Sequence, residues 1–505
     1  MASPSVSECN AACPFPLTKI IVATYVGPNG KDASLVMTHI TDGLSRQIEG
    51  AIASVTGVFF DPVVRVGVTG LSRAGKTVFI TALVANLLDR TRMPQLRAHT
   101  TGRIEAVHLQ PQPDLTLPRF GYEDHMAALT GDTPHWPQST RALSELRLSF
   151  RVRPQGIIGA FSGPRHVHVD IVDYPGEWLL DLGLLDKSYA EWSDATLDRI
   201  AKRPEAAEFM AIARAEDGAL RLDEPRATAL AQSFTAYLTR ARAAGWSDCT
   251  PGRFLLPGDL AGSPVLTFAP LPKPADPSRN SLWREMERRY NGYVARVVKP
   301  FFRDHFARLD RQIVLIDVLG AIHQGPQAFE DLRRTMADVL AAFKPGRNGW
   351  LTSILGGKRI EKILFAATKA DHLHHTQHPA LTAIMQAMLR DAKSRADFAG
   401  AQTMAISMAA LRCTVEETIH RDGMALDAVR GRLLDTGKQA AMYPGQLPAD
   451  PAKLLSPARA GATKWLDADY GVMGFAPARL QRDAAGGLPH IRLDRAAEFL
   501  IGDRL

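Results

Sequence analysis

A glycine-rich segment at residues 70–77, GLSRAGKT, has the residue types and spacing needed to bind a nucleotide phosphate. It matches G-x-x-x-x-G-K-[ST], in which the glycines let successive backbone N–H groups point at one anion. The Lys76 ammonium would contact the β- and γ-phosphates, and the Thr77 hydroxyl would ligate Mg²⁺. A β-branched run at 63–68 precedes the motif and an apolar helical stretch at 78–88 follows it, as such a loop requires. The predicted phosphate-binding residues are Gly70, Leu71, Ser72, Arg73, Ala74, Gly75, Lys76 and Thr77.

A second motif, VDIVDYPGE at 169–177, follows in a later strand of the same predicted domain. Asp173 ends an apolar strand, where a carboxylate can hold Mg²⁺ through water. Gly176 can bring its N–H to the γ-phosphate and sense its loss. Glu177 occupies the position where Ras-like proteins carry a water-orienting glutamine, so it could orient the attacking water or accept its proton. The alternative for Glu177 is an exposed loop carboxylate without a role in catalysis.

The loop between these two motifs, WPQSTRALSEL at 136–146, is expected to close over the nucleotide. A hydroxyl from such a loop contacts both Mg²⁺ and the γ-phosphate in related enzymes. We predict that Thr140 supplies this hydroxyl, with Ser139 as the alternative, although turns are rich in both residue types.

The tetrapeptide Thr368-Lys369-Ala370-Asp371 follows the apolar run ILFAA and predicts how the base is recognised. The Asp371 carboxylate can accept from N1–H and from the exocyclic amine of guanine together, whereas adenine would leave it unsatisfied. The Lys369 stem can cover the plane of the base. The segment is similar to the [NT]-K-x-D element of translation-factor-like GTPases, with Thr368 in place of asparagine.

A further segment, SMAALR beginning at Ser407, lies where those GTPases carry S-A-K. We expect residues 407–410 to lend backbone N–H groups to guanine. Asp371 makes GTP the preferred nucleotide. Because agreement with the S-A-K pattern is poor, ATP stays open as the alternative.

The arrangement of these motifs predicts an α/β fold with a P-loop NTPase core of the Ras-like kind, in which helices flank a mainly parallel sheet. We expect a mobile leader at 1–36 and a first part of the nucleotide domain at 37–177, beginning with an amphipathic helix from Ile40. A stretch rich in Ala, Leu, Arg and Glu predicts a helical insertion at 178–312. Residues 313–505 are expected to complete the domain with C-terminal helices.

Composition narrows the remaining possibilities. The chain has 505 residues and a formal net charge of +7, which is too mild an excess to indicate a nucleic-acid partner. It contains no secretory signal and no apolar run of about 18 residues, so no transmembrane segment is expected. Its four cysteines are too few and too scattered for a disulfide framework, which favours a reducing cytoplasm.

Four histidines stand close together in DHLHHTQH, at positions 372, 374, 375 and 378. Two of them could meet on one helical face and bind zinc. Because no set of cysteines or carboxylates in the segment completes such a site, we interpret it as a polar loop.

Taken together, the motifs resemble the YcjX family of bacterial stress-associated P-loop proteins. The resemblance rests on GLSRAGKTVFIT, DYPGEWLLDL, IDVLGA, TKADH, the turn at 443–448 and the ending HIRLDRAAEFLIGDRL, and it runs from about residue 40 to the C-terminus. It implies guanine-nucleotide binding by a Ras-like core and, by association, an inner-membrane partner protein. A separate likeness concerns Arg73, because guanylate-binding and atlastin-type GTPases carry an arginine there that acts as an internal finger. Arg73 could therefore neutralise transition-state charge, unless it points to solvent or pairs with a carboxylate.

Three functions remain open at this point. The first is a Mg²⁺-dependent GTP-hydrolysing switch that binds GTP and GDP, with a stress-related role implied by the family resemblance. The second is an ATPase coupled to chaperone-like or remodelling work. The third is a scaffold that binds nucleotide without turnover.

Overall fold

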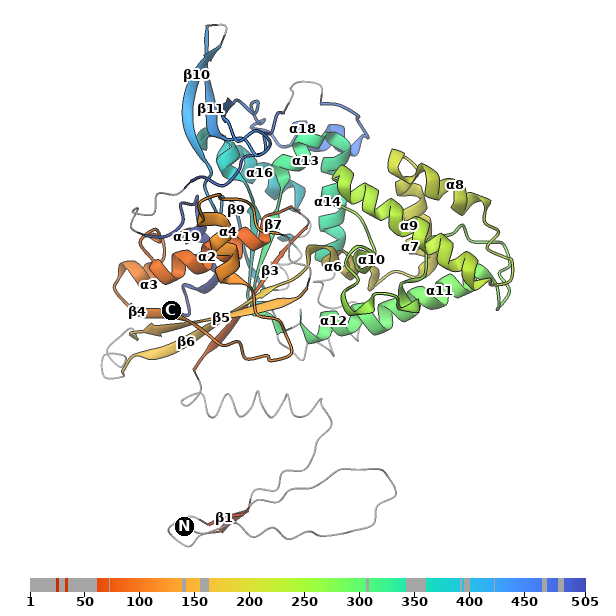
Figure 1. Cartoon of the computed structure of the whole chain (residues 1–505), viewed down its shortest axis with the longest axis horizontal. Coiled ribbons are helices and arrows are strands. Elements are labelled where there is room, and N and C mark those ends of the chain that lie inside the picture. The colour runs from red at the N-terminus through yellow and green to blue at the C-terminus, as the bar shows by residue number, and fades with distance from the viewer. Residues whose placement is uncertain are drawn as a thin grey trace. The chain divides into compact units, whose positions relative to one another are not determined.

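The computed structural model describes most of the chain from residue 61 onward, together with two short paired strands near the N-terminus (Figure 1). These are β1 (Thr24–Val26) and β2 (Asp32–Ser34). The rest of 1–60, including the helix predicted from Ile40, lies outside the described residues, as do 72, 139–141, 155–162, 306–307, 342–359, 391–392, 395–399, 422, 466–469 and 480–485. The chain divides into two units, 1–62 and 63–505, and the predicted nucleotide motifs lie in the second.

A seven-stranded sheet forms the centre of the second unit, in the order β4-β5-β6-β3-β7-β8-β9. Five neighbouring strands are parallel, and their bounds are β6 (Arg165–Asp173), β3 (Val63–Gly70), β7 (Arg311–Ile316), β8 (Lys362–Ala367) and β9 (Gln402–Ser407). At one edge β5 (Ser144–Val152) runs antiparallel to β6, and β4 (Ile104–Gln110) runs antiparallel to β5. The structure is thus the predicted mainly parallel α/β fold with a P-loop NTPase core.

Helices cover both faces of the sheet, because the central strands alternate apolar side chains between two cores. In β7, Ile313 and Leu315 face a core that includes α2 (Lys76–Asp89) and the C-terminal α19 (Leu493–Ile501). Val314 and Ile316 face the opposite core. That second core is completed by α13 (Val318–Gln324), α14 (Pro326–Ala341), α16 (His378–Met388) and α18 (Ala452–Arg459).

The segment between β6 and β7 is helical and has its own aromatic-rich core. Its larger helices are α7 (Tyr189–Ile200), α8 (Ala207–Ala215), α9 (Glu224–Ala244), α11 (Leu282–Tyr293) and α12 (Lys299–Asp304). They lie together beside the sheet, coloured yellow to green in Figure 1. The sheet resumes at Arg311, so Arg311 and Gln312, which the sequence assigns to the insertion, are strand residues. The buried Arg311 guanidinium is tolerated in the strand because it pairs with Glu361 and Asp503 at 2.5 and 2.9 Å.

Beyond the β1–β2 pair, which falls within the predicted mobile leader at 1–36, two sheet elements of the second unit were not predicted. One is the edge strand β4, and the other is a three-stranded antiparallel sheet between β9 and α18. Its strands are β10 (Thr414–Arg421), β11 (Met424–Arg432) and β12 (Gln439–Met442). The β10–β11 hairpin extends away from the central sheet (Figure 1). Within the described ranges, no helix combines the length and apolar character needed to cross a bilayer.

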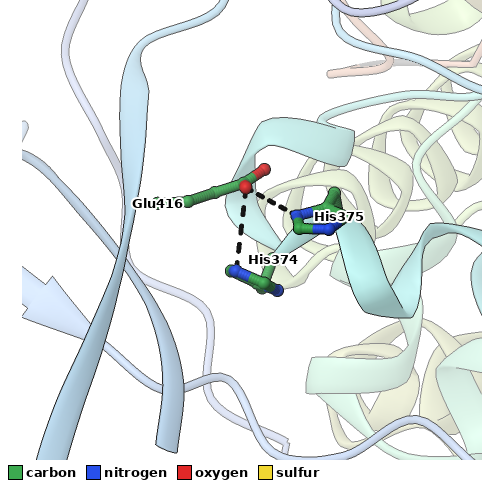
Figure 2. Close-up of side chains that lie close together, drawn as sticks. All are labelled: His374, His375 and Glu416. Carbon is green, nitrogen blue, oxygen red and sulfur yellow. Dashed lines mark hydrogen bonds and ion pairs between the residues drawn. The ribbon is translucent and has the colours of Figure 1, made fainter.

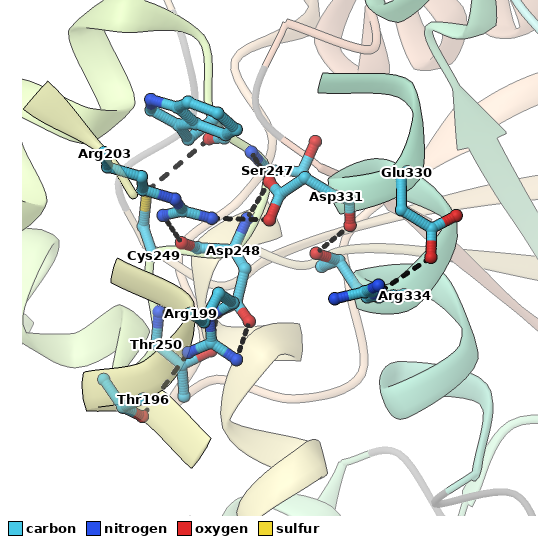
Figure 3. Close-up of polar contacts among 12 residues, drawn as sticks. Thr196, Arg199, Arg203, Ser247, Asp248, Cys249, Thr250, Glu330, Asp331 and Arg334 are labelled. Carbon is cyan, nitrogen blue, oxygen red and sulfur yellow. Dashed lines mark hydrogen bonds and ion pairs between the residues drawn. The ribbon is translucent and has the colours of Figure 1, made fainter. Parts of the chain in front are cut away.

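A buried polar network joins the insertion to α14 (Figure 3). Arg203, which is 4% exposed, lies 2.5 Å from Asp331 of α14 through its Nη2 atom. The second oxygen of Asp331 accepts from the backbone N–H groups of Ser247 and Asp248 at 2.8 and 3.0 Å. Arg199 pairs with the Asp248 carboxylate at 2.7 Å. Because removing one partner of such a pair leaves a buried charge uncompensated, the network fixes this part of the insertion to α14.

Candidate functional site

The predicted phosphate loop joins the end of β3 at Gly70 to the start of α2 at Lys76. Gly75, the residue before the helix, has a φ of 83°, a left-handed conformation that glycine adopts at little cost. Arg73 also has a positive φ, 65°, although it carries a side chain. Such unfavourable backbone geometry often marks a binding loop, because it turns consecutive N–H groups toward one point. Ser72 lies outside the described residues.

Two of the predicted Mg²⁺ ligands are placed by neighbouring elements: Thr77 lies in the first turn of α2, and Asp173 ends β6. Asp173 is the last residue of β6 and pairs in register with Val68 of β3, two residues before the loop begins. Both residues are buried, with 1% of Asp173 and 8% of Thr77 exposed. A hydroxyl and a carboxylate are hard oxygen donors of the kind that Mg²⁺ prefers, so this donor set fits the ion.

Gly176 lies directly against the phosphate loop. A Cβ atom at this position would lie 2.2 Å from the Gly70 carbonyl oxygen and 3.1 Å from Lys76 Nζ. Only glycine allows the DYPGE segment to approach the loop this closely. The contact joins the two motifs that the sequence assigns to the γ-phosphate.

Glu177 is buried, with 6% of the residue exposed, so it is not the exposed loop carboxylate of the alternative interpretation. It lines the cavity described below. Its Oε1 atom lies 2.5 Å from Nη2 of Arg242, near the end of α9 in the insertion. The sequence gives no sign of this partner, because 64 residues lie between the two positions and no local pattern relates them.

Other contacts tie the residues after Glu177 to the insertion. Asp181 accepts from the Gly252 N–H at 2.8 Å and from the Tyr293 hydroxyl at 2.5 Å. Burial raises the pKa of Asp181 to about 6, although these hydrogen bonds act in the opposite direction. The Arg253 guanidinium stacks over the Trp178 ring, 3.3 Å from its centroid. The segment that follows Gly176 is therefore held by the insertion over several residues.

The Thr368–Asp371 turn follows β8 at the same edge of the sheet. Asp371 is 4% exposed, and its Oδ2 atom accepts from the Cys413 N–H at 2.8 Å, which fixes the orientation of the carboxylate. Lys369 has a φ of 59°, and its ammonium pairs with Asp317, the N-cap of α13. Thr368 donates its backbone N–H to Ile316 O at 3.0 Å.

The segment that begins at Ser407, predicted to bind the base, makes several of its hydrogen bonds within the protein. Its hydroxyl donates to His378 O at 3.1 Å and accepts from Arg492, also at 3.1 Å. The following N–H groups of Met408 and Ala409 donate to Ala367 and Ile491 carbonyls at 2.8 and 3.1 Å. Ser407 is not among the described residues that line the cavity, whereas residues 408–411 are.

A cavity of about 390 Å³ brings the phosphate and base motifs together. Its wall contains residues 73–77 of the phosphate loop, Glu177, Thr368, Lys369 and Asp371. Sequence reasoning missed the apolar part of the wall, which is formed by Trp136, Pro137, Leu411, Leu434 and Phe475. Trp136 and Pro137 begin the loop that is predicted to supply a hydroxyl, and an aromatic ring followed by a rigid proline is the sequence signal for this wall. Thr140 and Ser139 themselves lie outside the described residues.

His372 also lines the cavity, and it lies on a buried turn, not in a polar loop. Its ring meets that of Phe475 edge to face, with centroids 5.2 Å apart. Burial lowers the pKa of His372, so its imidazole is neutral at physiological pH. Its Nδ1 atom has no hydrogen-bond partner among the described residues, which leaves a polar group at the base side of the cavity.

Comparison with known proteins agrees with this geometry. The sequence model of the YcjX-like family, DUF463, matches residues 64–505. The chain is 38% identical over 459 residues to a protein of Escherichia coli K12 named Ras-like GTPase YcjX, with 88% of this chain and 96% of that protein covered. It is 34% identical over 471 residues to a protein of the same name from Shewanella oneidensis MR-1, with 88% and 95% covered. The chain is therefore a member of the YcjX-like family.

Proposed function

We propose that this protein binds GTP and GDP in the cavity of about 390 Å³ and hydrolyses GTP in a Mg²⁺-dependent reaction. One observation carries the proposal: the phosphate loop and the Thr368–Asp371 turn line the same cavity. Its volume is in the range of small-ligand sites. The name Ras-like GTPase, given to two relatives that match nearly their full length, supports the same assignment.

Base selection is assigned to Asp371. Each oxygen of an ionised carboxylate can accept two hydrogen bonds, so the bond from Cys413 leaves capacity for two guanine donors. Adenine presents no such pair of donors and would leave a buried carboxylate unsatisfied, at a cost of about 1–3 kcal/mol. The aromatic side chains of Trp136 and Phe475 supply an apolar wall of the kind against which bases pack.

The phosphate side is assigned to the loop and to Lys76, whose ammonium lies beside Gly176. Thr77 and Asp173 would hold Mg²⁺, which when bound neutralises charge on the β- and γ-phosphates. Glu177 lies at the cavity wall, where a carboxylate can orient water for attack. Arg73, also at the wall, is assigned the finger role that its likeness to other GTPases implies.

The insertion is assigned the role of reporting nucleotide state. A loss of the γ-phosphate releases Gly176, and the residues after it are bound to the insertion through Arg242, Gly252 and Tyr293. Movement of the DYPGE segment must therefore either break these contacts or move the insertion. We propose that this coupling makes the protein a switch, in the stress-related and membrane-partner setting that the family resemblance implies.

The base assignment is tested by the Asp371→Asn variant. An asparagine presents an N–H where guanine also has donors, so affinity should move from guanosine to xanthosine diphosphate by at least about 10-fold. Asp124→Asn, an exposed change on α4 (Tyr122–Thr130), is the matched control and should keep the wild-type preference. An unchanged preference in Asp371→Asn, or a wild-type preference for ADP, would contradict the assignment and favour the ATPase alternative.

Turnover is tested by phosphate release from GTP with Mg²⁺ present. The proposal expects release well beyond one equivalent per chain, and a strong decrease in Lys76→Ala. Release that stops at or below one equivalent in the wild type would instead favour a nucleotide-binding scaffold.

A further inference from the structure

A cluster of metal-ligating side chains lies beside the β10–β11 hairpin, outside the nucleotide cavity (Figure 2). His374 and His375 come from the turn at the start of η8 (His375–Gln377), and Glu416 comes from β10. One donor atom of each residue lies within 4.8 Å of the other two. Figure 2 shows both rings turned toward the same carboxylate oxygen. The sequence could not predict this arrangement, because the carboxylate that completes the cluster lies 41 residues from His375.

The distances between the donor atoms are close to those of a zinc site, and small side-chain movements would bring them into agreement. Glu416 Oε2 lies 2.7 Å from His375 Nδ1 and 3.7 Å from His374 Nε2. Two ligands each bound at about 2.0–2.1 Å in tetrahedral geometry stand about 3.3 Å apart. The two observed distances lie on either side of that value. The residue types, two imidazoles and one carboxylate, form a set that leaves a position for water.

The surroundings of His374 fix which of its nitrogens can bind a metal. Its Nδ1 atom lies 2.9 Å from Thr376 Oγ1 and 3.4 Å from Asp427 Oδ2. Thr376 itself donates to Asp427 at 3.3 Å, so its oxygen is left to accept from His374. The Nδ1 atom therefore carries the proton, and the lone pair of Nε2 points toward Glu416. A carboxylate that orients a metal-binding histidine in this way is a common second partner of zinc sites.

The remaining groups around the cluster permit a cation. His375 is 65% exposed at its side chain, so its proton can move to Nε2, which leaves Nδ1 able to bind the metal. Arg412 pairs with Glu416 through the other oxygen, because its guanidinium lies 3.7 Å from Oε1. Asp427 sits on the same face of the hairpin as Glu416 and adds a second negative charge.

We propose that His374, His375 and Glu416 form a binding site for a divalent transition metal, with zinc as the best match. The metal would replace the proton now shared between His375 and Glu416. It would join β10 to a turn that begins three residues after Asp371, and so would fix the base of the β10–β11 hairpin. The inference does not depend on nucleotide binding.

The test is calorimetric titration of the untagged, chelator-treated full-length chain with zinc alone. Excess Mg²⁺ is present to occupy the hard oxygen site at Thr77 and Asp173. One equivalent of zinc should bind, and His375→Ala and Glu416→Gln should each weaken affinity by at least about 100-fold. Asp427→Asn should weaken it about 10-fold, as losses of orienting partners do. Cobalt in place of zinc should give the intense visible absorption of a four-coordinate site.

His420→Ala is the matched control, because His420 lies on the same face of β10 as Glu416 but is exposed and outside the cluster. It should bind zinc like the wild type. Thermal unfolding of each variant without metal checks that the fold is intact, and Glu416→Gln preserves shape if an alanine variant does not fold. The proposal would be overturned if the wild type showed no saturable zinc binding, or if His375→Ala and Glu416→Gln bound zinc as tightly as the wild type. Loss of zinc binding in His420→Ala would also overturn it.

Discussion

Glu177 and Arg242 form an ion pair, with 2.5 Å between Oε1 and Nη2. One residue directly follows the glycine expected at the γ-phosphate, and the other lies near the end of the longest helix of the insertion. Glu177 is also part of the cavity wall. The pair therefore connects the carboxylate that we propose orients the attacking water with a region far from it in sequence.

Replacement of Glu177 by alanine should lower kcat for GTP by about 100-fold, because a positioned carboxylate contributes on that scale. Affinity for GDP should change by less than about 3-fold, since the phosphate loop and Asp371 are untouched. Steady-state phosphate release and GDP titration measure the two effects. An unchanged kcat would show that Glu177 does not orient the water.

Replacement of Arg242 by alanine should lower kcat by about 10-fold by releasing Glu177 from its position. The free energy of unfolding should fall by about 1–2 kcal/mol, less than for a fully buried pair because the Arg242 side chain is 31% exposed. A double-mutant cycle with Glu177→Gln isolates the pair. If the two changes are additive in both stability and kcat, the ion pair has no role in either.

The Gly176→Ala variant should bind a GTP analogue at least about 10-fold more weakly than the wild type. Its new methyl group would lie 2.2 Å from Gly70 O, so the phosphate loop and the DYPGE segment must separate. Gly292→Ala in α11 is the control, because a Cβ there meets no described atom within 4 Å outside the backbone of its own helix turn. That change should leave affinity unaltered and raise stability by about 0.5–1 kcal/mol, as alanine does in a helix. Equal affinity of Gly176→Ala and the wild type would contradict the close approach.

Asp181 should make stability depend on pH. Its pKa is raised from 3.8 in the unfolded chain to about 6 in the folded one, so its contribution is greatest below the unfolded value and is lost as pH rises through about 6. Asparagine does not titrate. Between about pH 4.5 and about pH 7.5, the free energy of unfolding of Asp181→Asn should therefore gain about 2 kcal/mol relative to the wild type. Denaturant unfolding at both pH values measures this, and a constant difference would contradict burial of an ionisable Asp181.

Much of the central sheet could be predicted, because its interior strands are continuous apolar runs. The strands predicted at 63–68 and 363–367 correspond to β3 and β8. The start of β7 was missed because Arg311 is polar, and only distant acidic partners make its burial acceptable. The hairpin β10–β11 was missed because charged residues interrupt its alternation, as on a strand pair that faces water.

The polar residues of the site were easier to predict than its walls. Phosphate loops and base-reading turns have fixed local spacing, so Lys76 and Asp371 are visible in the sequence. Long-range packing, which no local pattern encodes, brings three other residues to the site: Arg242, Asp317 and Phe475. The interactions of Ser407 depend in the same way on Arg492, 85 residues further along the chain.

The most direct test of the account is calorimetric titration with GDP, a non-hydrolysable GTP analogue and their adenine counterparts, with Mg²⁺ present. The wild type should bind both guanine nucleotides at one per chain and the adenine nucleotides at least about 10-fold more weakly. Lys76→Ala should lose about 100-fold in affinity for the guanine nucleotides, as truncation of a charged phosphate contact does. Equal or tighter binding of the adenine nucleotides, or wild-type affinity in Lys76→Ala, would contradict guanine-nucleotide binding at this site.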